Sequence, residues 1–159
     1  MRHSLTIYDD PVFYIQGFSN ILLQKEIFSS VHHYNSQKDF VDNYKVKPTD
    51  FVIYGSHQKS VHEIIDTLHE VSQNNKKVRI AVIGNYFDLN DIRKLFEKGI
   101  HCYLEKDTNF EEFLEAMKIL KSQEIYICNS AKERMIGYIS NQSQNLPNNS
   151  ESLTKREIE

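Results

Sequence analysis

The feature that most constrains the fold is an alternation of short apolar runs with amphipathic stretches over the first 122 residues. The apolar runs have the length of single strands and are rich in Val, Ile, Phe and Tyr; they lie at residues 5–8, 27–33, 51–54, 78–83 and 101–104. Two of them are nearly continuous rather than alternating, a pattern typical of parallel strands covered on both faces.

Helical periodicity fills the stretches between these runs. Apolar residues recur at i, i+3, i+4, i+7 and i+10 in the clearest case, which comprises Val61, Ile64, Ile65, Leu68 and Val71. Similar patterns predict helices over 12–24, 91–98 and 110–120. Strand alternating with helix predicts an α/β fold, a doubly wound five-stranded parallel sheet with helices on both faces, closest to the flavodoxin-like order.

The character of the chain changes after residue 122. Residues 123–128 are expected to form a short extended piece, and 130–140 a further helix. Residues 141–150 are polar, contain a proline and offer almost no apolar anchors, which indicates a flexible linker. Residues 154–157 then form a capping box, so a helix is expected to begin where the chain stops. We therefore expect three parts, at 1–122, 123–150 and 151–159, the last being the start of a truncated second domain.

Composition excludes several classes of function. The net charge of −3 and the pI near 6.2 provide no basic footprint for nucleic acid. Cys102 and Cys128 lack CxxC spacing, the seven histidines follow no metal-binding spacing, and the five glycines are isolated, so no phosphate-binding loop is present. The longest apolar runs are strand-length and no leader is visible, so a cytoplasmic protein is expected.

Five stretches occur in an order and spacing that carry a family signature. Residues 7–11 end a strand with an acidic pair, 50–55 and 78–84 are buried strands, 98–107 combine a glycine, an aromatic residue and a lysine, and 153–159 open a helix. Together they resemble the receiver domain of a two-component response regulator. The subgroup is NarL/LuxR (FixJ), which carries a C-terminal LuxR-type helix-turn-helix domain, and the resemblance covers most of the chain.

The resemblance implies a degenerate phosphorylation pocket. In that family clustered acids bind Mg²⁺, an aspartate accepts the phosphoryl group, and a lysine and a hydroxyl residue contact it. The resemblance maps Asp9 and Asp10 onto the metal-binding acids and Lys106 onto the lysine. It maps Gly55 onto the phosphoacceptor and Gly84 onto the hydroxyl residue, and neither glycine has a side chain for the task. It therefore implies a pseudo-receiver that signals by binding and is not an enzyme.

The roles of Asp9, Asp10 and Tyr103 in this pocket each have more than one interpretation. Asp9 and Asp10 either retain weak Mg²⁺ binding, pair with Lys106 in a metal-free pocket, or only favour the dipole of the helix that follows. Beyond that weak Mg²⁺, no cofactor is expected. Tyr103 stands at the position of the family's aromatic switch. It is expected either to hold an inward rotamer in the space left by Gly84, or to act as a half-buried packing residue.

The neighbours of Gly55 are expected to be poor surrogate acceptors. Tyr54 should point to the opposite side of its strand, Ser56 lacks an activating base, and His57 fits a solvated loop. The leading hypothesis is thus an atypical receiver of a DNA-binding transcriptional regulator, acting through homodimerisation or protein contact. It would bind DNA only through the missing C-terminal domain, and its kinase is unknown. The alternatives are a pocket that binds a small-molecule or protein signal, and a phosphoreceiver with a surrogate acceptor.

Overall fold

Strands and helices alternate throughout the computed structural model, which describes residues 3–9, 12–56 and 59–141. The elements in chain order are β1 Ser4–Tyr8, α1 Val12–Gln24, β2 Ser30–Tyr34, α2 Gln37–Val46, β3 Phe51–Gly55, α3 Val61–Asn74, β4 Arg79–Gly84, α4 Leu89–Glu97, β5 Cys102–Glu105, α5 Phe110–Lys121 and β6 Tyr126–Ile127. A further helix spans residues 129–141. Residues 142–159 lie outside the described residues, and with them all but the first residue of the expected linker and the expected start of a second domain. Asp10 and His57 also lie outside them.

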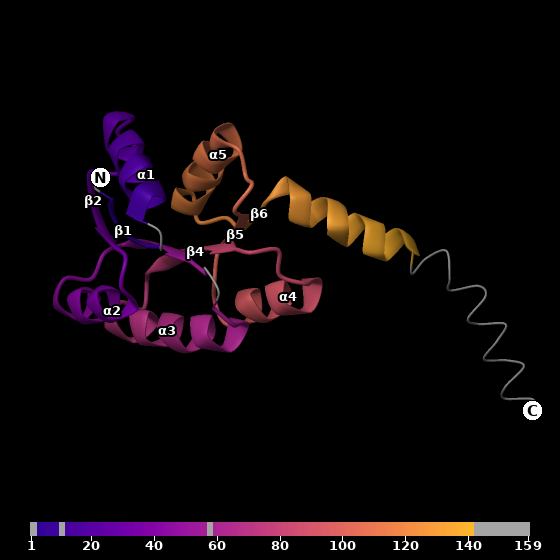
Figure 1. The fold of residues 1–159 in the computed structure, drawn as a ribbon, viewed down its shortest axis with the longest axis horizontal. Coiled ribbons are helices and arrows are strands. Elements are labelled where there is room, and N and C mark those ends of the chain that lie inside the picture. Colours follow the sequence, from indigo (N-terminus) through magenta and orange to yellow (C-terminus); the bar gives the residue numbers. More distant parts are fainter. Residues whose placement is uncertain (1–2, 10–11, 57–58, 142–159) are drawn as a thin grey trace, which may run out of the picture.

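The strands form one parallel sheet in the order β2-β1-β3-β4-β5-β6. Figure 1 shows α1 and α5 on one face of this sheet and α2, α3 and α4 on the other. The chain order reverses at β1, between β2 and β3, which is the signature of a doubly wound, flavodoxin-like sheet. The predicted fold class is confirmed.

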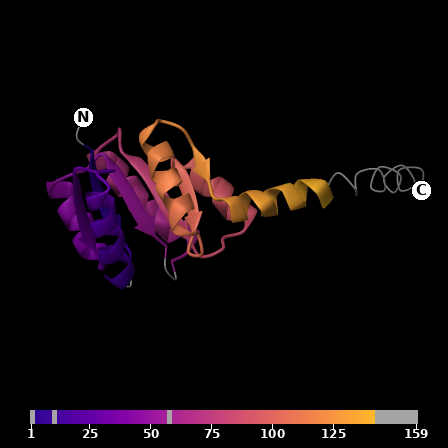
Figure 2. The ribbon, with the colours of Figure 1, turned by 90° about the horizontal axis from the view of Figure 1, so that it is seen from above.

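The sheet extends one strand further than predicted. Strand β6 pairs with β5 through Cys102↔Tyr126 and Tyr103↔Ile127, so six strands rather than five occur in the described part of the chain. Tyr126 is buried, and Cys128 and Ala131 are completely buried in the same core as the other strands. The folded unit therefore continues past residue 122. The helix at 129–141 starts on this unit and projects away from it, as Figure 2 shows.

Helix α2 was not predicted from the sequence because its apolar side is narrow. Phe40 and Tyr44, spaced i and i+4, are its buried residues, and the rest of its sequence is mostly polar. Ser36 begins the helix by accepting a hydrogen bond from the Asp39 N–H. Strand β2 also begins later than predicted, and Phe28 is buried before it rather than within it.

We find no helix in the described ranges that combines the length and the apolar character needed to cross a membrane.

Candidate functional site

The residues singled out by the sequence meet at the carboxyl edge of the sheet. Asp9 follows β1, Gly55 and Gly84 end β3 and β4, and Lys106 follows β5. Because the strands are parallel and adjacent, these strand ends lie side by side, with Gly84 in register with Glu105. The structure thus brings together the predicted pocket residues that it describes.

Asp9 fills the space beside Gly55. Its side chain is buried, with 7% of the residue exposed. A Cβ atom built on Gly55 would overlap the Asp9 carboxyl Cγ and Oδ1 atoms and would lie 2.7 Å from the Asp9 Cβ. The Asp9 N–H donates to the Tyr34 carbonyl at 3.2 Å, which fixes the strand end that carries the carboxylate. A side chain at position 55 requires Asp9 to move.

Tyr103 fills the space beside Gly84 in the same way. A Cβ atom on Gly84 would overlap the Tyr103 hydroxyl and would lie 2.8 Å from Cζ. Tyr103 is completely buried; its hydroxyl donates to Glu105 Oε2 at 2.8 Å and accepts from the Phe87 N–H at 3.3 Å. Burial, and then the bond to Glu105, raise the Tyr103 pKa, so the neutral hydroxyl acts as a donor. The ring is turned toward Gly84, and it is fully rather than half buried.

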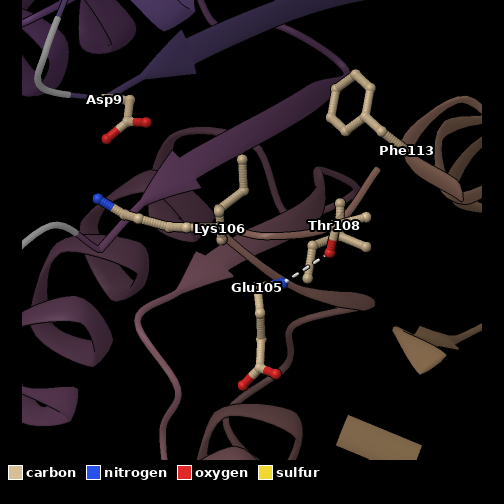
Figure 3. Close-up of a pocket in the computed structure, with 7 residues that line it drawn as sticks. Asp9, Glu105, Lys106, Thr108 and Phe113 are labelled. Atoms are coloured by element: carbon tan, nitrogen blue, oxygen red, sulfur yellow. Dashed lines mark hydrogen bonds between the residues drawn. The ribbon is translucent and has the colours of Figure 1, made fainter. Parts of the chain in front are cut away.

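A small cavity lies between these strand ends. Its volume is about 70 Å³, and its lining residues are Asp9, Ile83, Leu104, Glu105, Lys106, Thr108 and Phe113. Figure 3 shows Asp9 and Lys106 on one side of this cavity, with the Glu105 carboxylate pointing away from Asp9. The Glu105 N–H donates to the Thr108 hydroxyl at 3.2 Å, which holds the loop after β5. A cavity of this size has room for a few water molecules or a small anion.

Of the two acids expected to bind Mg²⁺, the structure describes Asp9. Mg²⁺ requires several oxygen ligands in near-octahedral geometry. Within residues 3–9, 12–56 and 59–141, no three His, Cys, Asp or Glu side chains gather closely enough to hold a metal. Asp9 lies against Gly55, which offers no carboxylate, and Glu105 points away and binds Arg134. The described residues therefore offer the Asp9 carboxylate as the acidic ligand at this edge, and Asp10 lies outside them.

Glu105 is a member of the site that the sequence analysis missed. Its side chain is completely buried and receives hydrogen bonds from Arg134 at 2.7 and 2.8 Å and from the Ser130 hydroxyl at 2.8 Å. Burial alone would raise the pKa of this carboxyl, but the bonds from Arg134, Tyr103 and Ser130 outweigh it and hold the pKa below its ordinary value. An acidic residue that ends a buried strand needs a cationic or hydrogen-bonding partner. The position of Glu105 at the end of an apolar run is therefore the sequence signal that could have revealed its role.

Comparison with known proteins identifies the fold. No family model and no curated protein matches the sequence. A LuxR-family two-component response regulator from Aurantimonas sp. SI85-9A1 superposes with a TM-score of 0.74 at 13% identity, covering 88% of this chain and 99% of that one. The chain has the receiver-domain fold.

Two further receiver structures agree with this assignment. The isolated REC domain of RcsB from Salmonella enterica serovar Typhimurium, with the phosphomimetic BeF₃⁻, gives a TM-score of 0.71 at 13% identity over 84% of this chain and 98% of that one. A LuxR-family DNA-binding response regulator from Silicibacter pomeroyi gives 0.66 at 18% identity over 81% and 98%. At these identities the likeness concerns the fold.

In this receiver fold, the neighbours of Gly55 are poorly placed as acceptors. Tyr54 is completely buried and packs against Tyr8 and Phe40, with ring centroids 4.9 and 5.9 Å away. It lies on the α2 side, and burial raises its pKa. Ser56 is 1% exposed, and its hydroxyl has no hydrogen-bond partner among the described residues. Both side chains are shielded from an incoming phosphodonor.

Proposed function

We propose that this chain is an atypical receiver domain of a LuxR-type response regulator that works without accepting a phosphoryl group. The observation that carries the proposal is the position of the Asp9 carboxylate, which lies in the space that a side chain at Gly55 would need. A phosphoacceptor and a metal-binding acid cannot share this space without rearrangement. The receiver fold and the order of the pocket residues along the strand ends support the same conclusion.

The domain would act by protein contact. Tyr103 is held inward by the space at Gly84 and by its hydrogen bonds, so the aromatic side chain is set by packing rather than by a phosphoryl group. Output would come from homodimerisation that positions a DNA-binding domain beginning near residues 151–159. RcsB, which shares the fold, has been seen as two dimers bound to two parallel DNAs. Helix-turn-helix domains read paired half-sites, which suits a dimeric receiver.

Phosphodonor treatment tests the proposal. The protein is incubated with acetyl phosphate and Mg²⁺ and its intact mass is measured, while its oligomeric mass is followed by light scattering with and without Mg²⁺ and beryllofluoride. We expect no added phosphoryl mass and no change in oligomeric mass. The RcsB receiver, treated in parallel, controls for the reagents. Stoichiometric labelling of the chain would overturn the proposal, and its loss in a Ser56→Ala or His57→Gln variant would identify a surrogate acceptor.

The cavity supports a second candidate, a receiver that senses a small anion. Its polar lining residues are the amine-bearing Lys106, Thr108 and the acids Asp9 and Glu105, and the rest are apolar. Its volume of about 70 Å³ limits the ligand to a few heavy atoms. A melting-temperature shift with phosphate, sulfate or acetate that is lost in Lys106→Met would favour this function. Equal shifts in both proteins would indicate a general salt effect.

A further inference from the structure

The helix at 129–141 is held to the receiver by two carboxylates, Glu112 and Glu105, in addition to the core packing of Ala131. At its start, Glu112 Oε2 accepts hydrogen bonds from the Asn129 N–H at 2.7 Å and from the Tyr126 hydroxyl at 2.6 Å. A carboxylate at this position also favours the helix dipole. One turn further on, the Arg134 guanidinium binds the buried Glu105 carboxylate through two nitrogens. Beyond that point, Ile136 and Ile139 are each 63% exposed, so the helix leaves the body of the domain.

Arg134 also reaches the loop between β4 and α4. Its Nη2 atom donates to the Phe87 carbonyl at 3.0 Å and to Glu105 Oε2 at 2.8 Å. The Tyr103 hydroxyl donates to the same Glu105 oxygen at 2.8 Å and accepts from the Phe87 N–H at 3.3 Å. Phe87, Tyr103, Glu105 and Arg134 thus close a four-residue ring of hydrogen bonds. It joins the β4–α4 loop, strand β5 and the last helix.

Breaking one hydrogen bond of the four-residue ring is expected to weaken the others. Glu105 is buried, so a displaced Arg134 would leave an uncompensated charge. Both polar groups of the Phe87 backbone are engaged, one by Tyr103 and one by Arg134. The preceding residue, Tyr86, adopts a left-handed backbone angle, with φ of 56°, which an ordinary residue holds only when its surroundings enforce it. Movement of this loop therefore removes support from Tyr103 and from Arg134 together.

We propose that the four-residue ring is a latch that couples the β4–α4 loop and Tyr103 to the docking of the helix at 129–141. A partner or ligand that displaces Phe87 or turns Tyr103 outward releases Arg134, and the helix loses its second attachment. Glu112, the Ser130 hydroxyl bond to Glu105 and the buried Ala131 then remain as the anchors of its first turn. The use of this release as output rests on the proposed function, whereas the coupling itself does not. The helix is the segment through which the receiver would pass its state to the residues that follow.

Hydrogen exchange measured by mass spectrometry tests the coupling. Tyr103→Phe keeps the aromatic side chain but removes the hydroxyl. That hydroxyl is connected to the helix through two hydrogen bonds, one to Glu105 and one from Arg134 to Glu105. We expect exchange to rise about fivefold, the loss of roughly one net hydrogen bond, in peptides covering both 85–88 and 133–141. Tyr44→Phe is the matched control, because it removes the buried tyrosine hydroxyl that donates to the Thr49 carbonyl at 2.7 Å in another part of the fold. Faster exchange confined to 85–88, or an equal effect of Tyr44→Phe on 133–141, overturns the proposal.

Arg134→Lys tests the coupling from the other side. It keeps the positive charge but cannot bind Glu105 and the Phe87 carbonyl through a planar fork. Coupling is reciprocal, so a substitution in the helix should speed exchange in the 85–88 loop. Exchange that changes in the helix alone would refute the latch. This readout is independent of phosphodonor labelling, so labelling of the protein would remove the proposed function and leave the latch standing.

Discussion

The Asp9 carboxylate and the Gly55 backbone are in direct contact at the carboxyl edge of the sheet, with no space for a β-carbon between them. This glycine is needed for its size and not for its backbone angles. Among the described glycines, Gly99 alone has a positive φ, of 105°. The two positions are therefore interdependent: a larger residue at 55 requires a different side-chain position at 9.

Gly55→Ala should destabilise the protein by about 1–3 kcal/mol, the range for inserting a methyl group into packed space. Asp9 cannot yield cheaply, because its Cβ as well as its carboxyl group lies within contact. In the double variant Asp9→Ala/Gly55→Ala the carboxyl overlap is removed and the Cβ contact stays. Urea unfolding followed by circular dichroism should show a coupling of at least about 0.5 kcal/mol between the two substitutions. Strict additivity would show that Asp9 does not occupy this space in solution.

Gly17→Ala supplies the matched control for these measurements. A Cβ atom on Gly17 meets nothing within 4 Å, and the residue lies exposed within α1. Because alanine favours helix more than glycine by about 1 kcal/mol, this variant should be neutral or more stable. A loss at position 17 equal to that at position 55 would show that the effect at position 55 does not arise from the contact with Asp9.

Gly84→Ala should displace Tyr103 from its inward position. The new methyl group would overlap the hydroxyl and the ring edge, and a rigid ring can avoid it only by rotating away. The hydrogen bonds to Glu105 and the Phe87 N–H would then be lost, and we expect a cost of about 2–4 kcal/mol. A crystal structure of the variant gives the decisive reading. If Tyr103 kept its inward position while the backbone at residue 84 stayed unchanged, the contact between Tyr103 and position 84 would be contradicted.

Removing one member of the Glu105–Arg134 pair should cost more than removing both. Arg134→Met leaves the Glu105 carboxylate buried without its ion-pair partner, and the expected loss is about 3–5 kcal/mol. In Glu105→Leu/Arg134→Met no buried charge remains, so much of the stability should return. Urea midpoints of the two variants provide the comparison. A double variant as unstable as Arg134→Met would mean that the pair contributes more than charge compensation.

Much of the fold was predictable because burial on both faces of a parallel sheet leaves apolar runs in the sequence. Strands β3 and β4 are buried at every position, and apart from Arg79 at the start of β4 the sequence shows them as continuous apolar segments. The positions of Gly55, Gly84 and Lys106 followed from family spacing, and the shared edge from the parallel order. Helix α2 has two buried residues, so it leaves no long apolar pattern to detect. The extended piece expected at 123–128 contains β6, but two residues do not show that this strand joins the sheet.

The connection between the pocket and the last helix could not be predicted from periodicity. Glu105 and Arg134 are 29 residues apart, and their pairing depends on how the helix at 129–141 returns to β5. In the sequence, Arg134 is one polar residue among several in a predicted helix. The contact between Asp9 and Gly55 is equally tertiary, because it depends on the side-chain rotamer of Asp9 as well as on strand register. Such contacts link segments whose local sequences carry no common signal.

Acid should destabilise the protein first through His101. Its Nδ1 atom accepts the Ile80 N–H at 3.1 Å, and burial, helped by the charge of Arg79, lowers its pKa from 6.5 to about 4. Between these values the unfolded chain binds a proton that the folded chain does not. The free energy of unfolding should therefore fall as the pH drops from about 6.5 to 4, by about 3 kcal/mol at most, a figure that solvent screening of the half-buried ring reduces. The lowered pKa of Glu105 acts in a more acidic range, because its contribution is lost only as the pH falls below about 4.5.

His101→Asn separates the two effects. The amide oxygen of asparagine can accept the Ile80 N–H without binding a proton, so the variant should lose most of the pH dependence between 6.5 and 4. Urea titrations at half-unit pH steps measure the slope, and His69→Asn on the exposed side of α3 serves as the matched substitution. A His101→Asn profile as steep as that of the unmodified protein would assign the acid sensitivity to other groups. A steep fall that begins only below pH 4.5 would point to Glu105, since protonating that carboxylate removes the charge that holds Arg134.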